Sequence, residues 1–452
     1  MEDFDKNTTE GYTAAEPAPQ PSEQAAAAYA AGMPARKRFT VTGFEVIAAF
    51  LSFIAAYVYA KVLVNDWGPD GPGWRIMIVA GLLLVITELV NRGRKIRWES
   101  FVWLGVFLLC AVSCSFGIGE VWEPYQVFFF THVFLIWWVL SRSDMLLDHD
   151  SSRFLPVDAL DGFCIFPFRY FVLRIRTIVA GIRGNGERKE KRKAGEVWLV
   201  ILAVAAAVTL FIAAFVLLLR ADSGFGSGIR EFLEQLDLEW FLERFLWFVL
   251  SLPVGAYLYG LIGGTARTPR AVPDGRRNWA LRVLNGIRRV PGTFWTVVIC
   301  LFSVLYVAFF VVQGTYLFGA FAGQLPEGFS ASQYAREGFF ELCKVMAVNF
   351  AVLWLTTRMT KEEDARKPLF TAGVLALLTE SMIFAAIAFS KLGLYISRFG
   401  FTPLRLQSTW LVCVLFMGCL LWTVSFLSGR KTIRIWMIFG AVTLIGLQYV
   451  PM

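Results

Sequence analysis

Long apolar stretches recur along almost all of the chain after residue 43, and short loops rich in charged or polar residues separate them. A helix needs about 20 apolar residues to cross a hydrocarbon core about 30 Å thick. Inside lipid the backbone polar groups must be satisfied by the chain itself, so only helices or closed barrels cross it. The pattern therefore predicts an all-α polytopic membrane protein.

Eleven segments have the length and composition of transmembrane helices, and a count of ten to twelve fits the pattern. They lie at residues 44–64, 74–90, 98–117, 124–140, 197–219, 245–263, 292–318, 338–357, 369–391, 405–427 and 433–450. Charged residues make up 17% of the chain, compared with about 25% in soluble domains. We expect four helices in residues 44–140 and a second helical bundle in residues 197–450.

The loops between these segments alternate in their content of Lys and Arg. Residues 91–97, 141–196, 264–291 and 358–367 are rich in Lys and Arg taken together, whereas 65–73 and 118–123 contain neither. Cytoplasmic loops carry the basic excess, so we expect a cytoplasmic N-terminus and, with an odd number of spans, an external C-terminus. The same distribution explains the net charge of +8 by topology, and we expect no nucleic-acid partner.

Two stretches outside the spans have their own character. Residues 1–38 are rich in Ala, Pro, Glu and Gln, and we expect a disordered cytoplasmic tail there. Such a long n-region argues against a cleaved signal peptide. Residues 229–238 are acidic and amphipathic, which favours a short helix on the outer surface.

The basic loop 141–196 is long enough to do more than connect two spans. Residues 166–182 are mostly apolar but contain Arg169, Arg174 and Arg176. We expect a helix in the headgroup layer, with a short soluble helix as the alternative. The basic residues 184–193 follow it, so we predict contact of 166–193 with anionic lipid.

One metal motif begins in this loop but is incomplete. The run Asp158-Ala-Leu-Asp161-Gly162 resembles the start of the Asp-x-x-Asp-Gly motif of membrane CDP-alcohol phosphotransferases. Ile165 and Phe166 stand where Ala and Arg should follow. The later acidic pair of that motif is absent too, so we expect Asp158 and Asp161 to be loop carboxylates in water.

The sequence contains too few suitable side chains for other metal or cofactor sites. Asp144, Asp148 and Asp150 could gather around Mg²⁺, since hard cations prefer carboxylates, but no second acidic cluster accompanies them. We expect these carboxylates to be solvated as well. The two histidines, His132 and His149, are too few for a His-based zinc site or a Ser-His-Asp relay. A phosphate-binding Gly-rich loop is also absent from the sequence, and we predict neither a metal nor a cofactor.

Three blocks between residues 305 and 406 are the most distinctive part of the chain. They read Gln313-Gly-Thr-Tyr316-Leu-Phe-Gly, Tyr334-Ala-Arg336-Glu337-Gly-Phe-Phe-Glu341-Leu, and Arg398-Phe-Gly-Phe-Thr402-Pro-Leu-Arg405. Their order resembles a family of bacterial multi-pass membrane proteins known only as a domain of unknown function, in which the third block reads Tyr-Gly-Leu-Thr-x-x-Arg. This chain departs from that block at Phe399 and Phe401. The resemblance implies a bacterial inner (plasma) membrane location and implies no activity.

All three blocks fall at the predicted outer ends of spans. At 1.5 Å per residue, Gln313 is expected about 9 Å and Tyr316 about 4 Å below the outer end of their helix. A polar cluster near the outer face would bind a ligand or lock three helix ends together, and catalysis is a third alternative. The candidate ligand-binding residues are Gln313, Tyr316, Arg336, Glu337, Glu341, Lys344, Arg398, Thr402 and Arg405.

Four further polar residues lie inside predicted spans: Glu88, His132, Asn349 and Glu380. Counting from the helix ends places Asn349 about 15 Å and Glu380 about 18 Å deep, so the two are level. A charge at mid-bilayer costs about 2.5–3.5 kcal/mol. We therefore expect Glu380 to face the bundle interior, bonded to Asn349 or a neighbour. His132 is expected to be a hydrogen-bonded bundle residue, with a proton relay as the alternative.

These features favour a protein that binds or transports a solute or an envelope-related ligand. A membrane-embedded transferase acting on a lipid-linked substrate is the enzymatic alternative, and it would need a carboxylate base such as Glu337 or Glu341. A scaffold or sensor subunit that signals through residues 141–196 is the third. The sequence leans towards a protein that is not an enzyme.

Overall fold

The computed structural model describes residues 39–65, 73–183, 238–314, 321 and 331–450, without the side chains of residues 65, 238–242 and 331–337. Within these residues the chain is helical, and one isolated bridge pairs Val290 with Thr360. Val41–Met452 form one compact unit, to which all the helices named below belong. The predicted all-α class is confirmed.

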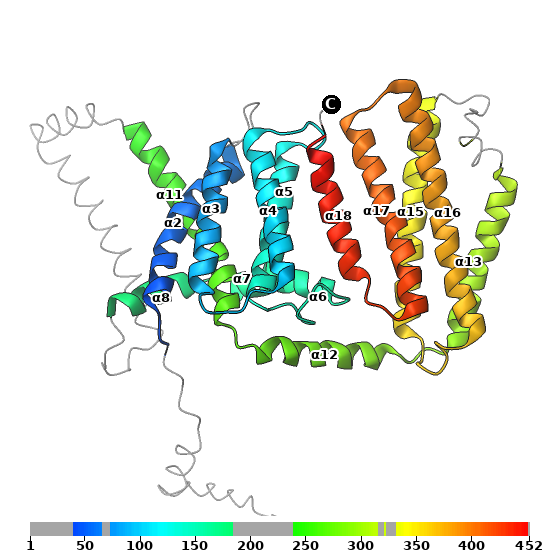
Figure 1. The fold of residues 1–452 in the computed structure, drawn as a ribbon, viewed down its shortest axis with the longest axis horizontal. Coiled ribbons are helices and arrows are strands. Elements are labelled where there is room, and N and C mark those ends of the chain that lie inside the picture. Colours follow the sequence, from blue (N-terminus) through cyan, green and yellow to red (C-terminus); the bar gives the residue numbers. More distant parts are fainter. Residues whose placement is uncertain (1–38, 66–72, 184–237, 315–320, 322–330, 451–452) are drawn as a thin grey trace, which may run out of the picture. The chain divides into compact units, whose positions relative to one another are not determined.

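Five long helices lie between residues 43 and 267 (Figure 1). They are α2 (Gly43–Asn65), α3 (Trp74–Val90), α4 (Trp98–Phe116), α5 (Pro124–Arg142) and α11 (Leu238–Arg267). Apolar side chains on most of their faces suit them to an apolar surrounding. Their inner faces share one core, which includes Leu83, Phe107, Trp138 and Tyr259.

A series of short helices follows α5: α6 (Leu155–Leu160), the π-helix η1 (Asp161–Ile165), α7 (Phe166–Arg169) and α8 (Leu173–Arg183). The single helix expected over residues 166–182 is therefore wrong, because a turn at 170–172 divides it. Tyr170 holds this turn against the end of α11, where its Oη lies 3.1 Å from Oγ1 of Thr268. Gly260 of α11 leaves room for the backbone of Pro167.

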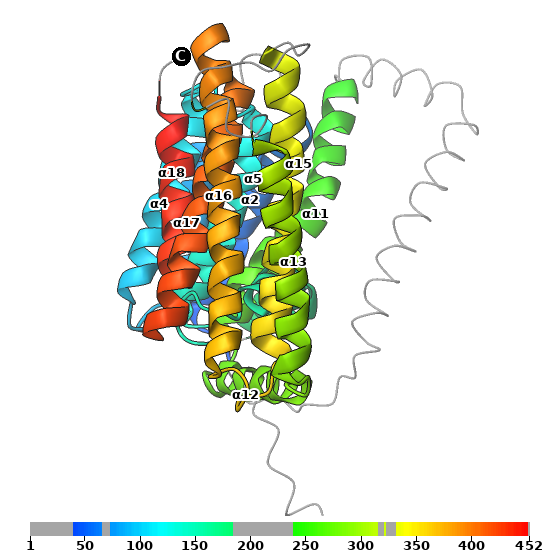
Figure 2. The same cartoon turned by 90° about the vertical axis from the view of Figure 1, so that its right-hand side faces the viewer.

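Six helices follow in the C-terminal half: α12 (Ala271–Ile287), α13 (Gly292–Val312), α15 (Ala331–Met359), α16 (Pro368–Phe399), α17 (Pro403–Ser428) and α18 (Ile433–Gln448). Of these, α12 runs across the direction of the other long helices, as the two views agree (Figure 2). A second core joins α13, α15, α16 and α17, and it includes Ile299, Met346, Leu377 and Phe384.

Eight described helices are long and apolar enough to cross a membrane: α2, α4, α5, α11, α13, α15, α16 and α17. The helices α3 and α18 coincide with predicted spans but have only 17 and 16 residues. The predicted span 197–219, the tail 1–38 and residues 229–237 of the predicted surface helix lie outside the described residues.

Three helix ends differ from the predicted ones. The helix α13 ends at Val312, so Gln313 is its C-cap residue and does not lie two turns inside the helix. The helix α15 begins seven residues before position 338, and α16 continues to Phe399. The expected depth of Gln313 inside its helix was therefore wrong, because α13 ends where this polar residue interrupts the apolar run.

Candidate functional site

A buried hydrogen-bonded cluster joins α13, α15 and α16. The Oη of Tyr306 donates to Oδ1 of Asn349 at 2.5 Å, and Nδ2 of Asn349 donates to Oγ of Ser381 at 3.0 Å. Both Asn349 and Ser381 are fully buried. Polar groups satisfied in this way hold three apolar helices in one register, because an unpaired buried amide would cost about 1–3 kcal/mol.

Glu380 lies beside this cluster and faces the bundle interior, with 7% of its surface exposed. Its Oε2 accepts a hydrogen bond of 3.1 Å from Oγ of Ser303 on α13. The partner is thus Ser303 rather than Asn349. One residue turns a helix by 100°, so Ser381 faces α15 while Glu380 faces α13.

Lys391 is a buried cation that the sequence reasoning missed. It is 1% exposed on α16 and packs against Gly338 of α15. Glu341 on α15 also interacts with it electrostatically. Lys391 follows Glu380 by three helical turns, which places both on one face of α16 about 16 Å apart. A lysine within a long apolar run was the signal that could have revealed it.

The third distinctive sequence block closes the end of α16. Nη1 of Arg405 donates to the backbone carbonyls of Phe399 at 2.9 Å and Gly400 at 2.6 Å. The same guanidinium lies 4.1 Å from the ring centroid of Tyr395. Gly400 has φ +76°, a conformation that glycine adopts readily at helix ends. Thr402 is the N-cap residue of α17, so the block joins two helices.

The remaining candidate residues predicted near the outer face do not gather at one place. The side chains of Gln313, Glu341, Lys344 and Arg398 are exposed. Tyr316 and the side chains of Arg336 and Glu337 lie outside the described residues. The nine outer candidates therefore form no single described cluster, and the polar groups that do converge lie deeper, around Glu380 and Lys391.

Two further polar groups lie among helices α2, α3, α5 and α11. Nδ1 of His132 lies 2.9 Å from Oη of Tyr59, and its Nε2 lies 3.4 Å from Oη of Tyr257. Glu88 accepts two hydrogen bonds of 2.7 Å from Nε and Nη2 of Arg142. The cavity beside His132 has a volume of about 20 Å³, which suits a water molecule and is far below the size of a ligand pocket.

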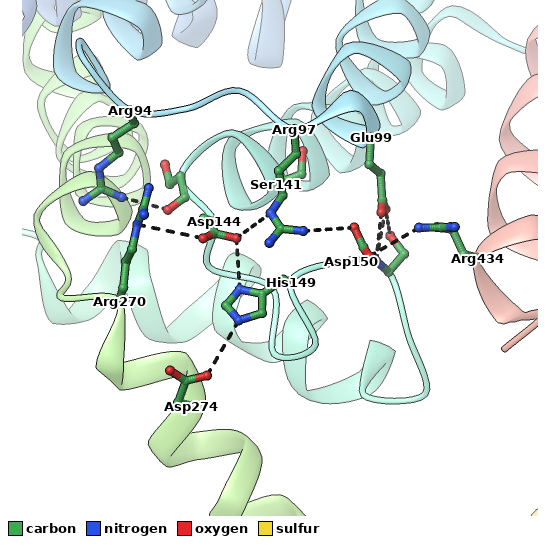
Figure 3. A network of polar contacts seen from close by, with 12 residues as sticks. Arg94, Arg97, Glu99, Ser141, Asp144, His149, Asp150, Arg270, Asp274 and Arg434 are labelled. Atoms are coloured by element: carbon green, nitrogen blue, oxygen red, sulfur yellow. Dashed lines mark hydrogen bonds and ion pairs between the residues drawn. The ribbon is translucent and has the colours of Figure 1, made fainter.

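A network of ion pairs connects the start of α4, the segment after α5, and helices α12 and α18 (Figure 3). Asp144 accepts from Nε of Arg97 at 2.9 Å, and its Oδ1 lies 3.0 Å from Nδ1 of His149. The other ring nitrogen of His149 lies 3.7 Å from Asp274 of α12. Arg434 of α18 lies 3.3 Å from Asp150. Residues far apart in the chain thus meet at one place.

A second set of carboxylates lies close by. Asp148 pairs with Arg277 at 2.6 Å and Lys431 at 3.5 Å, and Asp161 pairs with Arg276. Burial opposes ionisation of Asp148, but its two cationic partners outweigh it and lower its pKa. The expectation that these carboxylates are solvated is wrong, because arginines of α12 neutralise them in the interior.

Asp158 is the exception within this set. It is 1% exposed, its Oδ1 accepts the backbone N–H of Leu147 at 3.0 Å, and its Oδ2 has no partner among the described residues. Burial raises the pKa of Asp158 to about 7. No group of three His, Cys, Asp or Glu side chains in the described part of the chain could hold a metal ion.

Apolar helices of membrane-spanning length, with polar and charged side chains buried between them, define the chain as a polytopic helical membrane protein. The model of one family, described as a domain of unknown function (DUF4153), matches residues 46–452, and the chain belongs to this family. The family resemblance inferred from the sequence is confirmed. Neither a curated protein nor a solved structure matches the chain.

Proposed function

We propose that α13, α15 and α16 form a binding or transport site for a solute or an envelope-related ligand. The observation that carries the proposal is the pair of oppositely charged residues, Glu380 and Lys391, buried on one face of α16. Ionisable residues inside membrane helices are costly to insert and commonly mark a ligand or ion pathway.

The chemistry of these side chains suits such a role. The carboxyl group of Glu380 gains or loses a proton, and its bond to the Ser303 hydroxyl is compatible with either state. Lys391 offers a cation to an anionic group of a ligand. Beside Glu380, Tyr306 and Asn349 supply neutral donors and acceptors. A ligand that replaces the internal hydrogen bonds of this cluster would leave none of its polar groups unpaired.

The membrane arrangement is part of the same proposal. Eleven spans, a cytoplasmic N-terminus and a location in the bacterial plasma membrane would place Lys391 nearer the outer face than Glu380. Residues 141–196 would then be cytoplasmic. The exposed Arg169, Arg176 and Arg183, next to the exposed apolar Phe168 and Ile182, support contact of this segment with anionic lipid headgroups.

A non-enzymatic scaffold or sensor is the second candidate, and the ion-pair network supports it. Asp148 contacts both Arg277 of α12 and Lys431 before α18. A partner that binds the segment after α5 would therefore act on two other parts of the chain through charge pairs.

A ligand screen on the purified protein tests the first candidate. Amino acids, organic acids, nucleotides, sugars and lipid-linked sugars are added one by one, and the melting temperature is recorded, since a ligand that binds the folded state raises it. We expect one class to stabilise the wild type but not Glu380→Gln. The control Glu363→Gln, in an exposed loop, should respond like the wild type. Equal stabilisation of all three proteins would contradict the proposal.

A further inference from the structure

Arg174 of α8 is a buried cation whose guanidinium is only partly satisfied. Its exposed fraction is 3%. Nη2 donates to the backbone carbonyl of Leu252 on α11 at 3.0 Å. Nε and Nη1 form no hydrogen bond with the described residues. Two strong donors thus lie inside the protein, and no described residue accepts from them.

Helices α2 and α11 enclose this guanidinium. Its central carbon lies 4.0 Å from the ring centroid of Phe53 on α2, so one face stacks on an aromatic ring. On the other helix, Gly255 leaves space, because a Cβ there would collide with Nη1 of Arg174 and approach Cβ of Ala56 to 2.7 Å. The three helices α2, α8 and α11 therefore meet around the guanidinium.

Among the described residues, Arg174 has no counterion of the kind that Arg142 has. Arg142, which is equally buried, has the carboxylate of Glu88 on two of its nitrogens. No acidic side chain of the described residues pairs with Arg174. Burial lowers the pKa of Arg174 to about 10, so it still carries its charge at neutral pH. A buried charge without a partner is strongly unfavourable.

Two buried serines add neutral donors one helical turn away. Ser52 precedes Ala56 by four residues on α2, and Ser251 precedes Gly255 by four on α11, so each shares the face that meets Arg174. Both hydroxyls now donate to carbonyls of their own helices. A hydroxyl rotates readily and can turn its hydrogen to a new acceptor.

We propose that a small inorganic anion of the size of chloride binds between α2, α8 and α11, where it accepts a hydrogen bond from Nε–H of Arg174. A monatomic anion is smaller than a lipid headgroup, and it can accept from a rotated serine hydroxyl as well as from Nε–H. This site lies apart from Glu380 and Lys391 and does not depend on their role.

Halide binding is measured on the full chain in nanodiscs of neutral phosphatidylcholine. The melting temperature is followed as chloride or bromide replaces gluconate at constant ionic strength. Equilibrium dialysis with radioactive chloride gives the stoichiometry. We expect a saturable rise in the melting temperature and one chloride per chain. Parallel discs containing phosphatidylglycerol, in gluconate, test whether a lipid phosphate takes the place of the halide.

Three variants assign the effect to the site. Arg174→Gln and Gly255→Ala should each abolish the halide response, the second without removing a charge. The matched control Arg176→Gln removes an exposed arginine of the same helix and should retain the response. Should Arg174→Gln fail to fold, Gly255→Ala carries the test. A halide response that survives in Gly255→Ala, one lost equally in Arg176→Gln, or stabilisation by phosphatidylglycerol alone would overturn the proposal.

Discussion

The backbone of Gly338 on α15 lies directly against the ammonium group of Lys391 on α16. A Cβ at position 338 would come within 2.5 Å of Nζ and 3.2 Å of Cδ of that lysine. This contact gives the glycine of the second sequence block a physical role. Only a residue without a side chain lets the buried lysine lie between the two helices.

Replacing this glycine should therefore disturb the bundle. Gly338→Ala is expected to destabilise the protein by about 1–3 kcal/mol, because the buried side chain of Lys391 must shift to admit the added methyl group. Thermal unfolding in detergent measures the effect. The control is Gly393→Ala on α16, where a Cβ meets nothing within 4 Å, and better helix propensity should stabilise the protein by up to about 1 kcal/mol. Equal stability changes in the two variants would show that Gly338 has no special packing role.

Asp158 should make stability depend on pH. Its pKa is raised from 3.8 to about 7 in the folded protein. The folded state therefore binds a proton more tightly than the unfolded state, and protonation of Asp158 stabilises the fold. That stabilisation is fully present below about pH 4 and is lost as pH rises through 7, by at most about 4 kcal/mol. Asp158→Asn, which stays neutral, should flatten the fall in melting temperature between about pH 4 and pH 7.

The charged residues around Asp158 stay unchanged in this variant, so that only the titration of Asp158 is removed. Asp148, Asp161 and Glu99 act on it electrostatically, and Arg276 and Arg277 pair with the first two of these neighbours. Glu363→Gln, in an exposed loop, serves as the control and should keep the wild-type slope. If Asp158→Asn keeps that slope too, the carboxyl group of Asp158 titrates outside this range.

Orientation in the membrane can be tested with two described positions. The seven native cysteines are first replaced, and a single cysteine is then introduced into that background. One variant carries it at Glu120, in the loop between α4 and α5, and the other at Gly286, near the end of α12. An impermeant thiol reagent on intact cells should label position 120 and spare position 286, since basic residues mark the cytoplasmic side. The reverse pattern would invert the proposed topology.

Hydropathy was sufficient to locate the long helices, because membrane-spanning segments need continuous apolar runs. It could not place helix ends such as that of α15, where polar residues continue the helix beyond the apolar segment. The ion pairs of Asp161 and Asp148 could not be predicted from the sequence either. Their arginine partners lie 115 and 129 residues further along the chain, and no local pattern connects such positions.

The candidate site illustrates the same limit. Glu380 stood out in the sequence as a carboxylate within an apolar run. Its contact with Ser303, 77 residues away, required the packing of α13 on α16. Lys391 was hidden because the predicted span ended at that residue, so it looked like a flanking charge and not a buried one.

The central claim is that Glu380 and Lys391 belong to a binding site rather than to a purely structural cluster. The most direct measurement is the dissociation constant of the stabilising ligand for the wild type, Glu380→Gln, Lys391→Met and the control Thr379→Val, by calorimetry. We predict at least tenfold weaker binding, about 1.4 kcal/mol, to the first two variants, both of which remain folded, and no change for Thr379→Val. Unchanged affinity in Glu380→Gln and Lys391→Met would contradict the account.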